Sequence, residues 1–123
     1  MKKANLVINR NPITTKADTP LYDAIRLLAG NPTTSLLVVT DDHHLIGILS
    51  EKDLLKLLYN PSLNYKTVAD LMTRDVVSFD VNINLVEICK CLIENGFRRV
   101  PIVSEGKLIG VISRKDIIKS LLL

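Results

Sequence analysis

Hydrophobic and polar positions follow the same succession of patterns twice along this chain. Residues 21–28 and 85–92 each place apolar side chains at positions i, i+3, i+4 and i+7, which is the spacing of a helix with one apolar face. Apolar runs of strand length follow at residues 36–39 and 100–103. The pattern therefore predicts a helix and then a strand in each half, and it indicates an internal repeat.

The clearest copies of the repeat lie at residues 45–58 and 108–121. They read LIGILSEKDLLKLL and LIGVISRKDIIKSL, and they are identical at eight of fourteen positions. An apolar run that leads through Ser-x-Lys-Asp into an amphipathic run is typical of a strand that enters a helix. We expect the chemistry of the chain at these two strand–helix joints, whose polar residues are Ser50, Lys52 and Asp53, and Ser113, Lys115 and Asp116.

Each half is predicted to contain a short entry strand, a helix, a two-stranded hairpin and a second helix. Turn-forming residues at 60–64 indicate a linker, so we expect the halves at residues 1–60, with the N-terminal entry segment, and 61–123. One half is too small to bury its sheet alone. The predicted fold class is therefore α+β, with two β-α-β-β-α motifs packed through their small sheets around a pseudo-twofold axis.

Composition narrows the functional classes. Sixteen Lys and Arg against thirteen Asp and Glu give a net charge of +3, and the absence of a basic block disfavours nucleic-acid binding. The longest wholly apolar runs have four residues, far below the roughly 20 needed to cross a bilayer. No targeting segment follows the first residue. We therefore expect a cytoplasmic protein with no membrane association.

The residues that often bind metals or perform catalysis do not cluster. Cys89 and Cys91 lie at positions i and i+2 of a predicted helix, which suits neither a disulfide nor a shared metal, and Cys89 aligns with Ile25 as a core position. The adjacent His43 and His44 diverge in a predicted turn, without a Cys or a third His. The sequence thus predicts no metal site, no catalytic residues and no enzyme activity.

Three motifs in a fixed order carry a family resemblance. They are VADLMTRDVV at residues 68–77, GFRRVPIV at residues 96–103, and the two Gly-h-h-Ser-x-x-Asp copies, where h is apolar. With them the chain resembles a tandem pair of CBS (cystathionine-β-synthase-type) domains, known as a Bateman module. It departs from the pattern in the first half, where the entry at residues 5–15 matches poorly and Leu37 replaces the proline.

The resemblance implies a regulatory, energy-sensing module that binds AMP, ADP, ATP or S-adenosylmethionine in clefts between the two motifs. It implies no obligatory cofactor, a homodimer and an unidentified protein partner that the module regulates. In the family the Asp takes the ribose hydroxyls, and the entry segment of the other half holds the adenine. Carried over, one cleft would use Ser113, Lys115, Asp116, Arg98, Arg99, Thr14 and Thr15, and the other Ser50, Lys52, Asp53, Thr34, Ser35, Val77, Ser78 and Phe79.

Two alternatives stay open at this point. Ser-x-x-Asp before an apolar run also matches a capping box, in which the Ser and the acid only stabilise a helix start, and a CBS pair without ligand could serve as a structural or dimerisation module. The adjacent Arg98 and Arg99 favour an anionic ligand, although they could also be merely solvated. Because Thr34 and Ser35 stand in their place in the first half, we predict that a phosphorylated ligand fills the Asp116 cleft first.

Overall fold

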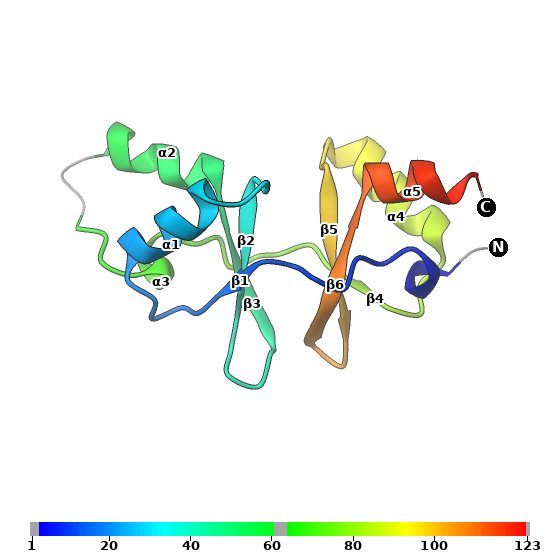
Figure 1. The fold of residues 1–123 in the computed structure, drawn as a ribbon, viewed down its shortest axis with the longest axis horizontal. Helices are drawn as coiled ribbons and strands as arrows, with labels where there is room; N and C mark the ends of the chain where they lie inside the picture. Colours follow the sequence, from blue (N-terminus) through cyan, green and yellow to red (C-terminus); the bar gives the residue numbers. More distant parts are fainter. Residues whose placement is uncertain (1–2, 61–63, 123) are drawn as a thin grey trace. The chain divides into compact units, whose positions relative to one another are not determined.

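The computed structural model describes residues 3–60 and 64–122. The chain divides into two compact units, Ile13–Val76 on the one hand and Met1–Pro12 with Val77–Leu123 on the other. We call them the Asp53 unit and the Asp116 unit, and each is described by itself (Figure 1).

The Asp53 unit contains one three-stranded sheet in the order β1-β2-β3. Strand β1 runs parallel to β2, and β2 and β3 form an antiparallel hairpin. The elements are β1 (Thr14–Thr15), α1 (Leu21–Ala29), β2 (Ser35–Val39), β3 (Leu45–Ser50), α2 (Glu51–Tyr59) and α3 (Val68–Leu71). The elements from β1 to α2 confirm the predicted β-α-β-β-α succession of the first repeat.

The Asp116 unit repeats this arrangement with the sheet order β4-β5-β6. Its strand pairs have the same directions, and both hairpins contain a register shift near the end of their first strand. The elements are the 3-10 helix η1 (Ala4–Leu6), β4 (Phe79–Asp80), α4 (Leu85–Asn95), β5 (Arg99–Ser104), β6 (Lys107–Ser113) and α5 (Arg114–Ser120). The predicted α+β fold class is thereby confirmed for both repeats.

Each unit has its own apolar core, built on the helix face that the sequence spacing predicts. In the Asp53 unit, Leu21, Ala24 and Leu28 of α1 are buried in one cluster with Met72. In the Asp116 unit, the equivalent face of α4 is buried with strand residues of β5 and β6, and Cys89 packs against this core. The periodicity therefore identified the side of each helix that the sheet covers.

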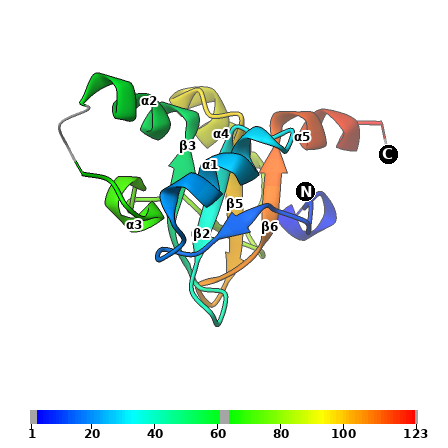
Figure 2. The same ribbon diagram turned by 60° about the vertical axis from the view of Figure 1, so that its left-hand side comes forward.

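The compact units do not coincide with the sequence halves 1–60 and 61–123, which remain a prediction about the repeat. The N-terminal segment lies beside β6 and completes the Asp116 unit (Figures 1 and 2). Ala4 is fully buried in its core, and Asn9 exchanges two backbone hydrogen bonds of 2.9 Å with Val111. In the Asp53 unit, Thr73 exchanges equivalent bonds of 2.8 and 2.9 Å with Ile48. Each hairpin thus pairs with a segment from the other half of the sequence.

The repeated glycine of each hairpin permits this close approach. A Cβ atom at Gly110 would lie 2.2 Å from the carbonyl oxygen of Asn9, and a Cβ atom at Gly47 would lie 2.8 Å from Sδ of Met72. Atoms cannot approach so closely without displacement. The glycines therefore serve packing between β3 or β6 and the segment that crosses it.

Pro101 explains a small difference between the two sheets. A proline cannot donate a ladder hydrogen bond, so one is expected at the start of a strand or at an unpaired edge, but Pro101 is the third residue of β5, the central strand. The equivalent Leu37 donates its backbone N–H to Ile13 at 3.1 Å, a bond that proline cannot make. Strand β4 accordingly begins at Phe79, opposite Ile102 and one position beyond the proline.

Candidate functional site

Both strand–helix joints form complete capping boxes. Ser50 donates its backbone N–H and its hydroxyl to Oδ2 of Asp53 at 2.9 and 3.0 Å, and the Asp53 N–H donates to Oγ of Ser50 at 3.3 Å. The same three bonds join Ser113 and Asp116 at 2.9, 2.8 and 3.1 Å. The structure therefore contains the capping box at both joints, and this box uses only Oδ2 of each carboxylate.

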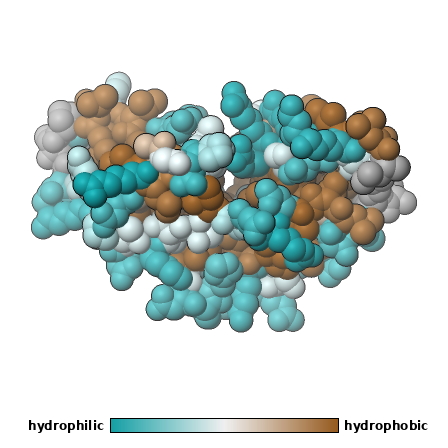
Figure 3. Space-filling model, in the orientation of Figure 1, coloured by the Kyte–Doolittle hydropathy of each residue, from teal (hydrophilic) through white to brown (hydrophobic). Residues whose placement is uncertain are grey.

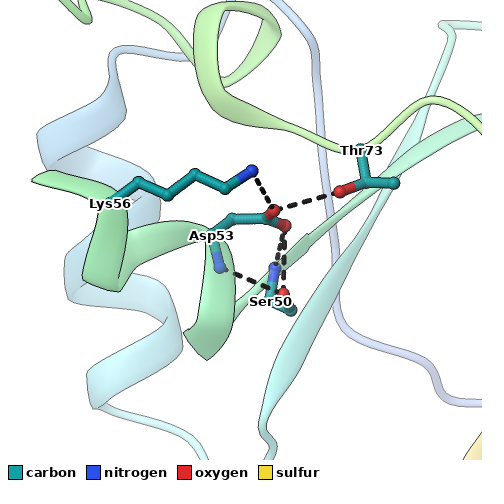
Figure 4. Close-up of polar contacts among 4 residues, drawn as sticks. All are labelled: Ser50, Asp53, Lys56 and Thr73. Atoms are coloured by element: carbon teal, nitrogen blue, oxygen red, sulfur yellow. Dashed lines mark hydrogen bonds and ion pairs between the residues drawn. The ribbon is translucent and has the colours of Figure 1, made fainter. Parts of the chain in front are cut away.

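The other carboxylate oxygen distinguishes the two joints. Oδ1 of Asp53 accepts a hydrogen bond of 3.0 Å from the Thr73 hydroxyl and one of 3.3 Å from Nζ of Lys56 (Figure 4). Asp53 is 3% exposed, whereas Asp116 is half-buried. Within residues 3–60 and 64–122, Oδ1 of Asp116 has no hydrogen-bond or ion-pair partner.

The residues at the matching positions explain this difference. Lys119 occupies the place of Lys56 three residues after the aspartate, but it is exposed and makes no ion pair with Asp116 among the described residues. Asn9 occupies the place of Thr73 on the crossing segment, and its Oδ1 instead accepts a 3.1 Å bond from the N–H of Asn11. The backbone is repeated, while the side chains around the carboxylate are not.

The predicted cations lie on the strand beside the Asp116 joint. Arg99 is opposite Ser113 in the β5–β6 register, and the carbonyl of Arg98 accepts a 3.0 Å bond from the N–H of Arg114. Arg98 and Lys115 are exposed. The structure thus brings Arg98 and Arg99 together with the joint at the level of the backbone.

The Asp53 joint has the same backbone arrangement with neutral residues. Ser35 is opposite Ser50 in the β2–β3 register, and the carbonyl of Thr34 accepts a 3.0 Å bond from the N–H of Glu51. Lys52 is exposed. The predicted adenine-contacting residues belong in each case to the other unit, so their role remains a prediction: Thr14 and Thr15 for the Asp116 joint, and Val77, Ser78 and Phe79 for the Asp53 joint.

Charge is distributed unequally between the two units. The Asp116 unit carries ten Lys and Arg against five Asp and Glu, a net charge of +5, and the Asp53 unit carries six against eight, a net charge of −2. A positive field raises the local concentration of anions. The field of the Asp116 unit therefore attracts anions more strongly than that of the Asp53 unit.

Sequence reasoning missed Thr73 and Lys56 as residues of the Asp53 joint. Lys56 carried a local signal, since a side chain three residues along a helix reaches the same face. Thr73 lies 20 residues from Asp53, and no local pattern in the sequence connects the two residues.

The histidine turn has a structural arrangement of its own. His44 Nδ1 lies 2.9 Å from Oδ2 of Asp42, and hydrogen bonds from Thr40 and His44 lower the pKa of Asp42 to about 2. The described residues hold no group of three His, Cys, Asp or Glu side chains that could bind a metal ion. In the same part of the chain, no helix is long and apolar enough to cross a membrane.

Comparisons with known proteins place these observations in a family. The CBS domain model matches residues 4–60 and 68–123. An uncharacterized protein of Methanocaldococcus jannaschii is 31% identical over 94% of this chain. The matched region makes up only 41% of the length of that relative. The crystal structure of CBSX2 in complex with AMP has a TM-score of 0.89 and 31% identity, with 99% of this chain and 97% of that one covered.

A second solved structure supports the fold alone. The CBS domain pair of protein MJ0100, in complex with 5-methylthioadenosine and S-adenosyl-L-methionine, has a TM-score of 0.81 at 20% identity, with 98% and 96% of the chains covered. The two matches to the family model cover both sequence repeats. The chain therefore belongs to the CBS domain family, as a tandem CBS pair.

Proposed function

We propose that this chain is a regulatory module, not an enzyme, that binds an adenosine-containing nucleotide through the Asp116 joint and transmits the bound state to a partner protein. The observation that carries the proposal concerns the Asp116 carboxylate: the cap fixes its Oδ2, and its Oδ1 has no partner among the described residues. The cytoplasmic location expected from the sequence belongs to the same proposal.

The chemistry of the Asp116 joint suits a nucleoside phosphate. A carboxylate oxygen with free lone pairs accepts hydrogen bonds from ribose hydroxyls, and the capping box fixes its orientation before a ligand arrives. The exposed cations Arg98 and Lys115 belong to the same unit. Charge-assisted hydrogen bonds from such groups to phosphate are roughly twice as strong as neutral ones.

AMP is the ligand that the comparisons support best. CBSX2, which shares 31% identity with this chain, was crystallised with AMP. ADP, ATP and S-adenosylmethionine contain the same ribose, so Asp116 alone would not separate them. The net charge of +5 on the Asp116 unit favours the phosphorylated ligands over the cationic S-adenosylmethionine.

A thermal-shift screen with AMP, ADP, ATP and S-adenosylmethionine tests this function. A ligand at 100 times its dissociation constant adds about 2.7 kcal/mol to the free energy of unfolding, which is a readily measured rise in melting temperature. We expect AMP to give such a rise. If none of the four ligands changes the melting temperature at millimolar concentration, the chain is a structural module and the proposed function is wrong.

We also propose that the module is a homodimer. Apolar side chains are exposed on α4, on α5 and just after the end of α5, where Ile93 is 81% exposed, Ile118 59% and Leu122 87%. Figure 3 shows the apolar surface over the end of α5. A groove of about 390 Å³ between these helices is lined mainly by apolar residues. Such patches often mark interfaces, and a monomer mass in light scattering at tens of micromolar would contradict the dimer.

A further inference from the structure

The Asp53 carboxylate is saturated: each of its four lone-pair positions already has a donor from the same chain. A carboxylate has about four acceptor positions, two on each oxygen. On Oδ2 they are taken by the N–H and hydroxyl of Ser50, and on Oδ1 by Thr73 and Lys56. A ribose hydroxyl can bind Asp53 only by displacing one of these donors.

Thr73 is the donor that the fold positions most firmly. Its backbone N–H and C=O bond to Ile48 at 2.8 and 2.9 Å, so the residue is fixed across β3 before its hydroxyl meets Asp53. Lys56 comes from the next turn of α2, and its side chain is half exposed. The Thr73 hydroxyl therefore competes with a ligand at little further cost in conformational entropy, because its backbone is already ordered.

We infer that Thr73, assisted by Lys56, is a positioning residue that withholds Asp53 from ligands, so that the Asp53 joint stabilises the fold and nucleotide binds first at the Asp116 joint. Only the part of this inference that concerns nucleotide binding rests on the proposed function. The Asp116 unit provides the internal comparison, because it has the same capping box, a lysine at the same helical position and the same backbone bridge, but Asn9 in place of Thr73.

Calorimetric titration with AMP tests the binding half. We expect one site in the wild-type chain, and a second site in the double variant Thr73→Val, Lys56→Met, because two acceptor positions on Asp53 become free. Each charge-assisted bond that a ligand gains corresponds to roughly a tenfold or larger rise in affinity. The matched control Thr73→Ser keeps the hydroxyl and should keep one site, as should Lys119→Met.

Two results of this titration would overturn the inference. Wild-type chains that bind AMP at two sites of equal affinity would mean that Thr73 and Lys56 do not compete with ligand. A double variant that still titrates with a single site, while remaining folded by circular dichroism, would mean that something other than these two donors excludes AMP from the Asp53 joint.

A ligand-free measurement tests the structural half separately. Thr73→Val should lower the melting temperature of the apo chain by about 4–8 °C, but by less than about 2 °C when Asp53 is already Ala. Equal losses in the two backgrounds would contradict a contact between the two side chains. If AMP does not bind the wild type at all, the proposed function fails, and the coupling between Thr73 and Asp53 alone decides whether the carboxylate is saturated.

Discussion

The Asp53 and Asp116 joints share a sequence motif, a capping box and a backbone bridge to a crossing segment, and they differ in what surrounds one carboxylate oxygen. Asp53 is buried and bonded to Thr73 and Lys56. Asp116 is half-buried, and Asn9 bonds to Asn11 instead. A duplicated motif can therefore support two different roles, because residues outside the motif determine which acceptors remain available.

The largest difference between the units should appear when Gly47 and Gly110, the glycines where another segment crosses β3 and β6, are replaced. We expect Gly110→Ala to lower the free energy of unfolding by about 3 kcal/mol, because its Cβ would meet the Asn9 backbone at 2.2 Å. Gly47→Ala should cost about 1–2 kcal/mol, because the nearest atom, 2.8 Å away, belongs to the flexible side chain of Met72, and the nearest backbone atom, the carbonyl oxygen of Thr73, is 3.1 Å away. Urea denaturation measures both.

Gly96→Ala provides a contrast for this pair. A Cβ at Gly96 meets no described atom within 4 Å, but the residue has φ of +68° at the end of α4, so its cost of roughly 1 kcal/mol would come from backbone strain alone. If Gly47→Ala proved as costly as Gly110→Ala, the crossing segments would be equally rigid and the contrast between side-chain and backbone contacts would be wrong.

Replacing the two aspartates compares the joints directly in the absence of ligand. We expect Asp53→Asn to lower the free energy of unfolding by about 2 kcal/mol, because the amide loses the ion pair with Lys56 and cannot accept all four hydrogen bonds. Asp116→Asn should cost about 1 kcal/mol or less, since an amide can retain part of the cap. Chemical denaturation of the two variants at neutral pH measures the difference.

Ser50→Ala and Ser113→Ala control for the caps themselves. Because the two serines make the same three bonds, these substitutions should have similar costs of about 1 kcal/mol. Equal losses for both aspartate variants would place the stabilising role in the cap and not in Thr73 and Lys56.

The sequence alone predicted the elements and the polar residues of both joints, because these depend on local patterns that occur twice. Apolar spacing located α1 and α4, and Ser-x-Lys-Asp located the starts of α2 and α5. The state of each carboxylate could not be predicted in the same way. Thr73 reaches Asp53 through pairing with β3, and such long-range pairing leaves no periodic signal in the sequence.

The N-terminal segment was the least predictable part of the fold. Its match to the second repeat is weak, and its contribution to the Asp116 unit depends on Ala4 in the core and on Asn9 beside Val111. The glycine at position 110 was visible in the repeat, but the repeat could not indicate which segment crosses it. Likewise Pro101 was expected at a strand start or edge, and the later start of β4 accommodates it in a central strand.

Asp116 should matter more than Asp53 for nucleotide affinity, whereas Asp53 should matter more for the stability of the ligand-free chain. We expect Asp116→Asn to weaken AMP binding tenfold or more, because a ribose hydroxyl loses its charged acceptor, while the melting temperature of the apo chain changes little. Asp53→Asn should leave AMP affinity within about twofold, since in the wild type that carboxylate is saturated. Calorimetric titration of both variants provides the measurement, and a larger loss for Asp53→Asn would reverse the assignment of the two joints.

The smallest expected effect concerns the hairpin turns, where the two repeats use different residues at a left-handed position. His43 has φ of +72°, and Gly106 has φ of +80° in the corresponding turn. A side chain other than glycine is strained in this region, so His43→Gly should raise the free energy of unfolding by about 0.5 kcal/mol after the larger entropy of the unfolded glycine is included. Gly106→Ala should lower it by about 1 kcal/mol.

His44→Gly serves as the control, since it removes the contact with Asp42 without relieving strain at His43, and it should not stabilise the chain. Thermal denaturation at neutral pH measures all three, and a His43→Gly variant less stable than the wild type would mean that the His43 side chain contributes more than its backbone conformation costs.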